Sequence, residues 1–160
     1  VLLGLMLSFE PIEKNIMRRP PRTPSTPLLT PALMLRIAIV STLLLAGAFG
    51  LFLWELEHGA SIEYARTVAA NVFVCGEIFY LFNCRSMSVS MFKLGVFSNH
   101  WLVGGVTLMT ALQLLFTYLP VMNAWFRTAP IDIWSWGRII AVGVIIYAII
   151  GMEKWLRREN

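Results

Sequence analysis

The sequence predicts an all-α integral membrane fold, in which the end of one transmembrane helix is followed by four complete transmembrane helices. Hydrophobic residues make up 58% of the 160 residues and charged residues only 14%, with a mean hydropathy of +0.70, whereas soluble domains are about 25% charged. Apolar stretches recur that are long enough to cross a hydrocarbon core of roughly 30 Å as helices. The 13 lysines and arginines lie mostly between or beside these stretches. The net charge of +4 therefore indicates a lipid bilayer as partner, and no nucleic acid.

The first 36 residues precede the first complete span. Residues 1–9 are apolar but too few to cross a bilayer, so we expect them to be the end of a helix that begins upstream, in the tail of a longer protein. Glu10 to Pro31 holds six prolines and four basic residues. Because proline removes helical hydrogen bonds, this part is predicted to be an extended loop, and 10–36 forms the loop and the entry to the next helix.

Residues 37–160 are predicted to form a bundle of four transmembrane helices. The first two spans are Ile37 to Trp54 and Ile62 to Cys84. The last two are Trp101 to Tyr118, which ends at Pro120, and Trp134 to Trp155. The last span is long enough if Arg138 and Glu153 snorkel to the membrane surfaces. Small residues at helix-packing spacing predict close contacts between helices, at Ala46 and Gly50, Ala65 and Ala69, and Gly137 and Ala141.

The distribution of basic residues predicts the orientation of the spans. Ten of the 13 fall on the side of the proline-rich loop and the C-terminus, and three fall on the other side. Cytoplasmic loops carry the excess of lysine and arginine, so the proline-rich loop and the C-terminus are expected in the cytoplasm. Tryptophans would then mark both interfaces: Trp54, Trp125, Trp134 and Trp136 the outer one, and Trp101 and Trp155 the inner one.

Glu77 is the candidate ion-binding residue, because it is an acid well inside the second span. A charged group at this depth is costly unless it faces a cavity, a cation or a partner. The side chains one turn away on its own helix carry no charge: Phe73, Val74, Tyr80 and Leu81. Glu77 is therefore predicted to bind a cation or a proton. A protonated glutamate that bonds to another helix for structure is the alternative.

Other polar residues have structural explanations that we prefer. Asn71, Asn83 and Gln113 could offer carbonyl oxygens to a hard cation, but such amides more often join helices by hydrogen bonds. An acidic patch at the outer end of the first hairpin, comprising Glu55, Glu57, His58 and Glu63, is expected to be solvated loop residues. Cys75 and Cys84 are interpreted as packing residues. We find no phosphate-binding glycine loop, catalytic triad or zinc spacing, so no hydrolytic centre is expected within this sequence.

Several motifs resemble P-type cation-transporting ATPases of the calcium and sodium/potassium pump type. The most specific is Phe9-Glu-Pro-Ile-Glu-Lys-Asn-Ile-Met-Arg-Arg-Pro-Pro-Arg22, which resembles the cytoplasmic loop after the sixth transmembrane helix. In order, Phe82-Asn-Cys-Arg-Ser86, Gly95-Val-Phe-Ser-Asn-His-Trp101, Thr128-Ala-Pro130 and Glu153-Lys154 resemble the last three helices of that family. The resemblance covers essentially the whole chain.

The resemblance implies that residues 1–9 end the sixth transmembrane helix and that the four spans are the seventh to tenth of ten. Glu77 falls where the eighth helix of calcium pumps contributes a carboxylate to an ion site. ATP, Mg²⁺ and a transported cation, with calcium favoured, are implied for the parent protein. Its upstream helices and cytoplasmic domains are the implied partners, in a plasma membrane of bacterial type. The family's residues after the sixth-helix acid, Gly-Leu-Pro-Ala, differ from Val1-Leu-Leu-Gly4 here.

Two other functions remain possible at this point. A stand-alone helical membrane subunit could scaffold a partner, with Glu77 bonding between helices and no transport chemistry. A half of a secondary transporter could use Glu77 for proton coupling, although the full spans show none of the broken helices typical of such transporters. An upstream Asp-Lys-Thr-Gly-Thr phosphorylation motif would distinguish the pump from both.

Overall fold

A computed structural model describes residues 2–9, 29–84 and 99–156, and these residues form helices without any strand. In chain order the helices are α1 (Leu2–Leu7), α2 (Pro31–Glu57), α3 (Ile62–Cys84), α5 (His100–Tyr118), α6 (Pro120–Phe126) and α7 (Ile133–Leu156). Four of them, α2, α3, α5 and α7, are long and apolar enough to cross a membrane. This confirms the predicted all-α membrane fold.

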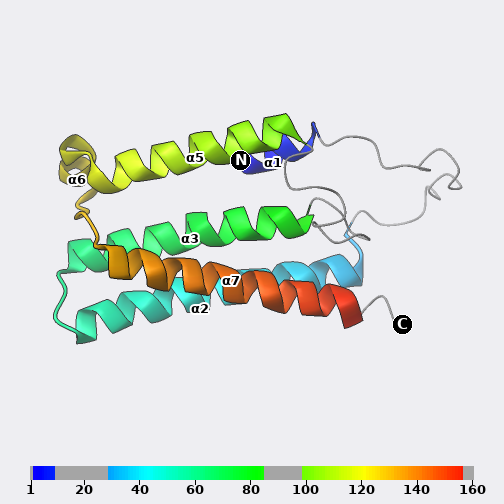
Figure 1. Ribbon diagram of the computed structural model, residues 1–160. Coiled ribbons are helices and arrows are strands. Elements are labelled where there is room, and N and C mark those ends of the chain that lie inside the picture. The colour runs from blue at the N-terminus through cyan, green and yellow to red at the C-terminus, as the bar shows by residue number, and fades with distance from the viewer. Residues whose placement is uncertain (1, 10–28, 85–98, 157–160) are drawn as a thin grey trace, which may run out of the picture.

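The four long helices lie side by side, so the bundle has two ends (Figure 1). We call the end that holds the α2–α3 turn and the α5–α7 connection the hairpin end. We call the opposite end, where α3 and α7 finish and α2 and α5 begin, the terminal end. The short α1 lies beside α5 in the half of the bundle nearest the terminal end (Figure 1).

The central helix is α3, which packs mainly against α7 and α2. On its other side it meets α5 and α1 through a smaller contact. The tightly packed group of α2, α3 and α7 is therefore one part of the molecule. The pair of α1 and α5, with α6 at its hairpin end, is the other (Figure 1).

The predicted spans agree with the helices except at some ends. The second span matches α3 in full, but α2 begins at Pro31, within the segment predicted to be extended, and not at Ile37. Thr30 is the N-cap of α2, because its Oγ1 accepts a hydrogen bond from the Leu33 amide at 3.3 Å. Proline is tolerated in the first turn, where its missing N–H has no helical partner.

The short helix α6 was not predicted. Pro120 was interpreted as the end of the preceding span, and it does follow the extended residue Leu119, which ends α5. Pro120 then begins a new helix that runs to Phe126 and ends at Arg127 in the left-handed conformation, with φ of 50°. The chain changes direction here before it enters α7 (Figure 1).

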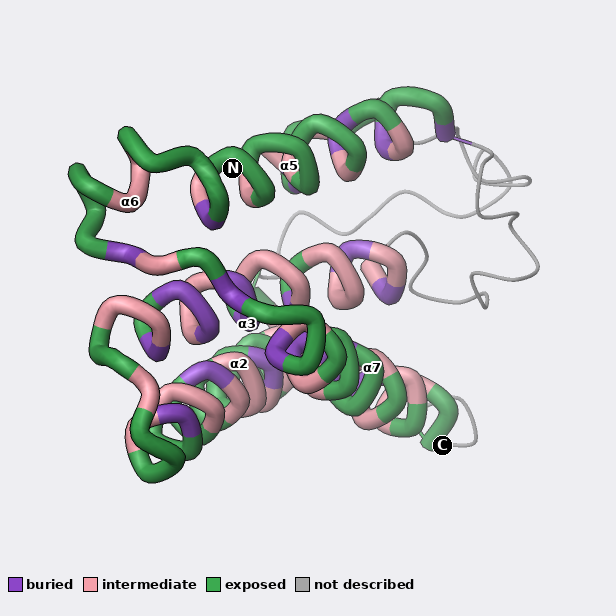
Figure 2. The backbone as a smooth tube through the Cα atoms, turned by 60° about the vertical axis from the view of Figure 1, so that its left-hand side comes forward, coloured by how far each residue is buried: buried purple, intermediate pink, exposed green. Residues whose placement is uncertain are grey.

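Many large apolar side chains of this bundle are exposed, and buried residues follow narrow stripes along the helices (Figure 2). A soluble protein rarely exposes apolar patches of this extent, whereas lipid solvates them. The buried apolar residues form three clusters, around Val68 and Ile139, around Leu81 and Leu102, and around Val40 and Ile146. Of the small residues predicted at contacts, Ala65 is buried and Ala69 packs against the first cluster. The others are exposed: Ala46, Gly50, Gly137 and Ala141.

Within the group of α2, α3 and α7, close approach of helices instead involves three other glycines, Gly47, Gly76 and Gly143. A Cβ placed on Gly47 would lie 2.6 Å from Val142, and one on Gly143 would lie 2.6 Å from Phe79. A Cβ on Gly76 would overlap Leu44. Each of these glycines lets α2, α3 or α7 come near a large side chain of a neighbouring helix.

Parts of the sequence interpretation lie outside the described residues. They include the proline-rich loop over 10–28, and the basic residues Arg85, Lys93, Arg157 and Arg158 used for the orientation. The structure bears on the helical bundle, on Glu77 and on the charged residues at the two ends of the spans.

Candidate functional site

Glu77 lies on α3, seven residues before the helix ends at Cys84, and its side chain is exposed in the bundle. None of the described residues forms a hydrogen bond or ion pair with it. At this depth in a span, a carboxylate without a partner is far more costly than in water. No contact within the described part of the chain therefore offsets the cost of placing the Glu77 carboxylate inside a span.

Glu77 continues a stripe of exposed residues on α3. Arg66 and Phe73 are exposed as well, and Arg66 precedes Glu77 by three helical turns, which places it roughly 16 Å nearer the hairpin end. Arg66 also forms no ion pair with a described residue. This face of α3 thus carries two charges of opposite sign, and neither α2 nor α7 covers it.

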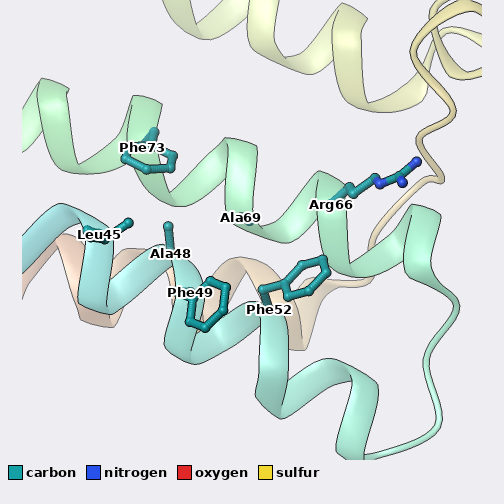
Figure 3. Close-up of a pocket in the computed structure, with 7 residues that line it drawn as sticks. All are labelled: Leu45, Ala48, Phe49, Phe52, Arg66, Ala69 and Phe73. Carbon is teal, nitrogen blue, oxygen red and sulfur yellow. The ribbon is translucent and has the colours of Figure 1, made fainter.

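A groove of about 310 Å³ runs beside this stripe, between α2 and α3. Its lining is apolar except for the arginine: Leu45, Ala48, Phe49, Phe52, Arg66, Ala69 and Phe73. Figure 3 shows Phe49 and Phe52 on α2 facing α3, and the Arg66 side chain extending toward the hairpin end. The groove is therefore open on the face of the bundle that carries Phe73 and Arg66.

The helix α1 lies beside the turns of α3 that hold Glu77. Leu3 belongs to the same buried cluster as Leu81, and Leu7 and Ile78 pack against that cluster. Both α1 and α3 run toward the terminal end, and the first residues of α1 lie about midway along the bundle (Figure 1). Residues at the start of α1 are thus close in depth to Glu77.

The buried amides join helices, as the structural interpretation predicted. Asn71 Nδ2 donates to Thr117 Oγ1 at 3.0 Å and to the Thr67 carbonyl at 2.8 Å, which connects α3 to α5. Asn83 Nδ2 donates to the Tyr147 carbonyl of α7 at 3.2 Å. These amides have their hydrogen-bond partners within the bundle and do not share the face of Glu77.

The acidic patch expected at the first hairpin is not a set of solvated loop residues. Glu55 is only 4% exposed and lies within α2. Its Oε1 accepts hydrogen bonds from Arg138 Nη2 at 2.7 Å and from Ser135 Oγ at 3.1 Å. Arg138 also lies over the Trp54 ring, at 4.2 Å from its centre. Arg138 is therefore paired with a buried acid of α2, and its snorkelling to the membrane surface stays a prediction.

A second polar contact at the hairpin end fixes the start of α7. Asp132 Oδ1 accepts hydrogen bonds from the Ser135 amide at 2.7 Å and from the Tyr64 hydroxyl at 3.0 Å. These bonds favour the ionised form, chiefly the one from the Ser135 amide, and hold the pKa of Asp132 below its usual value. Tyr64 thereby attaches the first turn of α3 to the first turn of α7.

The terminal end holds an ion pair between the first and last long helices. Arg36 Nη2 and Nε both donate to Glu153 Oε2, at 2.9 Å and 3.2 Å. The two side chains are only 12% and 14% exposed. Glu153 is therefore paired with Arg36 of α2, and its snorkelling likewise stays a prediction.

The described residues contain no group of three or more histidine, cysteine or acidic side chains that could hold a metal ion. A hard cation such as Ca²⁺ takes six to eight oxygen ligands. Glu77 can therefore supply one carboxylate to an ion site, and the other ligands of that site have to come from elsewhere.

We found no sequence signal for the pairing of Glu55 with Arg138, or of Arg36 with Glu153, since the partners are 83 and 117 residues apart.

Comparison with protein families gives a match over nearly the whole chain. Residues 1–156 match the family described as "Cation transporting ATPase, C-terminus". The match includes α1 and all four long helices, and it also includes the part of the chain between Phe9 and α2 that carries the proline- and arginine-rich motif.

Curated proteins with similar sequences carry related names. A probable cation-transporting ATPase F of Mycobacterium tuberculosis is 51% identical over 158 residues, which is 99% of this chain and 18% of that protein. The cation-transporting ATPase pma1 of Synechocystis is 31% identical over 85% of this chain and 16% of its own length. Calcium-transporting ATPase type 2C member 1 of Homo sapiens is 30% identical over 79% of this chain and 14% of its own length. The chain thus spans less than a fifth of the length of these relatives.

Proposed function

Because the chain belongs to the family formed by the C-terminal regions of cation-transporting ATPases, we propose that it completes the membrane domain of an ATP-driven cation pump and lends one ion ligand, Glu77. The parent is a P-type ATPase that uses ATP with Mg²⁺, both bound by cytoplasmic domains encoded upstream. The four long helices are its seventh to tenth, and α1 ends its sixth. In this role the bundle anchors the membrane domain and carries no hydrolytic centre.

The single observation that carries the role of Glu77 is its exposure without a partner. An acid inside a span is expected to face the bundle interior, a water-filled cavity or a cation. Glu55 and Glu153, which lie nearer the ends of α2 and α7, are buried against a basic partner. Glu77 instead faces outward on α3, where helices of the upstream four-fifths of the pump have to pack.

The position of α1 supports this placement. If α1 is the end of a longer helix, the turns before Leu2 run alongside α3 toward the hairpin end, past the level of Glu77. Ligands on those turns would then lie near the Glu77 carboxylate. A site shared between the helix before α1 and α3 would give a cation oxygens from two elements, which the described bundle alone does not offer.

Calcium is the ion that we favour. The human relative is named as a calcium-transporting ATPase, whereas the mycobacterial relative is named only for cations. A carboxylate suits a hard divalent cation. We also propose a plasma membrane of bacterial type as the location. The excess of basic residues on the side of the terminal end supports a cytoplasmic location for that end.

The scaffold subunit considered as an alternative has no observation in its favour. The chain matches the family of C-terminal regions of cation-transporting ATPases. An interhelical bond of Glu77 to a described residue, which the scaffold function needs, is not formed.

The test is ATP-driven uptake of Ca²⁺ and of competing cations into vesicles that hold the full-length pump. Glu77→Gln is compared with wild type and with Glu57→Gln, a matched change at an exposed acid at the end of α2. We expect Glu77→Gln to raise the cation concentration for half-maximal uptake about tenfold, which corresponds to roughly 1.4 kcal/mol of lost ion binding. Glu57→Gln should behave as wild type. Unchanged uptake by a folded, inserted Glu77→Gln protein would overturn the assignment.

A further inference from the structure

The connection between α5 and α7 exposes large apolar side chains where water-facing loops are usually polar. Along α6 and at the start of α7, Trp125 is 76% exposed, Ile133 76% and Trp134 75%. Val121 and Phe126 are 52% and 57% exposed. From Leu119 to Ile131 the only charged residue is Arg127. This composition does not fit a loop that projects into water.

The helix α6 has a face turned to the protein and a face turned away from it. Asn123 lies on the inner side, where its amide and the Thr128 hydroxyl are hydrogen bonded at 2.9 Å. Val121 and Trp125 lie one turn apart on the opposite side, and both are exposed. Helix α6 is thus amphipathic: its inner side is hydrogen bonded through Asn123, and its outer face is apolar.

The outer face of α6 continues the exposed apolar surface of α5. Leu108, Leu112 and Leu115 of α5 are each about half exposed, and Tyr118 and Leu119 extend this surface to Val121. The long helices cross the bilayer, so this α5 surface is solvated by lipid where no other helix covers it. At the hairpin end the same surface reaches the depth where hydrocarbon meets headgroups, which tryptophan prefers.

We propose that α6 is an interfacial helix, which lies in the headgroup layer at the hairpin end and inserts Val121 and Trp125 into the phospholipid bilayer. Arg127, exposed at the end of α6 and without an ion pair to a described residue, lies where it can contact lipid phosphates. The partner is the phospholipid interface itself. Helix α6 then fixes the depth of the hairpin ends of α5 and α7 in the membrane.

The experiment uses the full-length pump in phospholipid vesicles, with its other cysteines replaced. A nitroxide is attached at Trp125→Cys, and collision rates are measured with oxygen, which concentrates in lipid, and with a nickel chelate, which stays in water. The water control is Glu57→Cys at the exposed end of α2, and the lipid control is Leu112→Cys on α5. Val121→Cys is a second reporter on the same face of α6, in case the first variant does not fold.

We expect the oxygen-to-nickel ratio at 125 and 121 to be severalfold higher than at 57 and below that at 112. A ratio equal to that at 57 would overturn the proposal, because α6 would then lie in water. Low collision rates with both reagents would also overturn it, since another part of the pump would then cover α6. The collision rates at 125 and at 121 should agree, because both positions lie on the same face of α6.

Discussion

Glu55 and Glu57 lie two residues apart at the end of α2 but in different surroundings. Glu55 is buried and accepts from Arg138 Nη2 at 2.7 Å, whereas Glu57 is exposed. An ion pair of this kind contributes little if both groups are solvated, but breaking it leaves a charge without a partner in a region that water does not enter freely. The same change at the two acids should therefore have different effects.

We expect Glu55→Gln to destabilise the full-length protein by about 1 to 2 kcal/mol, because Arg138 loses its charged partner. The value is at the low end for a buried pair, since the Arg138 side chain is 30% exposed. Glu57→Gln is the matched control and should leave the melting temperature unchanged. Thermal unfolding in detergent measures both. Equal melting temperatures for the two variants would contradict the role assigned to the pair.

At this scale the sequence indicated Glu77 but not Glu55. Glu77 stands out because it interrupts an apolar run, which a hydropathy pattern reveals directly. Glu55 lies where a span was predicted to end, so its sequence context could not distinguish a buried acid from a solvated one. Its environment depends on Arg138 and Ser135 of α7, and only the packing of α7 on α2 brings these residues to it.

The helices themselves pack closely at specific glycines. At Gly143 a Cβ would lie 2.6 Å from Phe79 Cδ2 and 3.3 Å from Cys75 Sγ, so α7 approaches α3 there with no room for a methyl group. At Gly151, on the same helix, a Cβ would meet no described atom within 4 Å. A comparison of alanine substitutions at the two glycines therefore separates the effect of packing on stability from that of helix propensity.

We expect Gly143→Ala to lower the stability of the pump by about 1 to 3 kcal/mol, because Phe79 has to leave its position. Gly151→Ala should be neutral or stabilising by up to about 1 kcal/mol, since alanine is the better helix former. Melting temperatures of the purified full-length variants provide the comparison. A stabilising effect of both changes would show that α3 and α7 are not in contact at Gly143.

The elements were predictable in number and type, but less so at their ends and contacts. Apolar stretches of about the length needed to cross a bilayer identify each span, even where Glu77 or Arg138 interrupts one, because lipid imposes length and polarity together. The helix α6 was missed because seven residues are too short for that pattern and begin with a proline. The glycines at contacts were not identified because small residues recur by chance, and Ala46, Gly50, Gly137 and Ala141 lie on exposed faces.

The whole molecule consists of two helical groups that meet along α3. Asn71 and Thr117 form the buried polar link between them, with Nδ2 and Oγ1 3.0 Å apart. The cluster that includes Leu81 and Leu102 joins the same helices nearer the terminal end. The position of α5 relative to α2 and α7 therefore depends on this hydrogen bond, on the apolar cluster and on Tyr118 of α5, whose hydroxyl accepts a hydrogen bond from Trp136 Nε1 of α7 at 2.8 Å.

We expect Thr117→Val to cost roughly 1 kcal/mol and to speed hydrogen exchange along the hairpin half of α5, because the buried Asn71 amide loses a partner. Thr110→Val is the control on the same helix, since its exposed hydroxyl donates only to the Val106 carbonyl one turn earlier. Exchange followed by mass spectrometry on the full-length pump distinguishes the two. Similar exchange in both variants would mean that the link does not hold α5 in place.

The two ion pairs that connect α2 to α7 can form only late in the synthesis of this part of the chain. A ribosome makes α2 first, and Arg138 and Glu153 emerge only 83 and 117 residues after Glu55 and Arg36. During that interval α2 already carries an acid near one membrane surface and a base near the other, each lacking this partner. Insertion of α7 supplies both opposite charges at once. Helix α7 thus completes the charge balance of α2, and a nascent chain that stops short of α7 lacks both of these ion pairs.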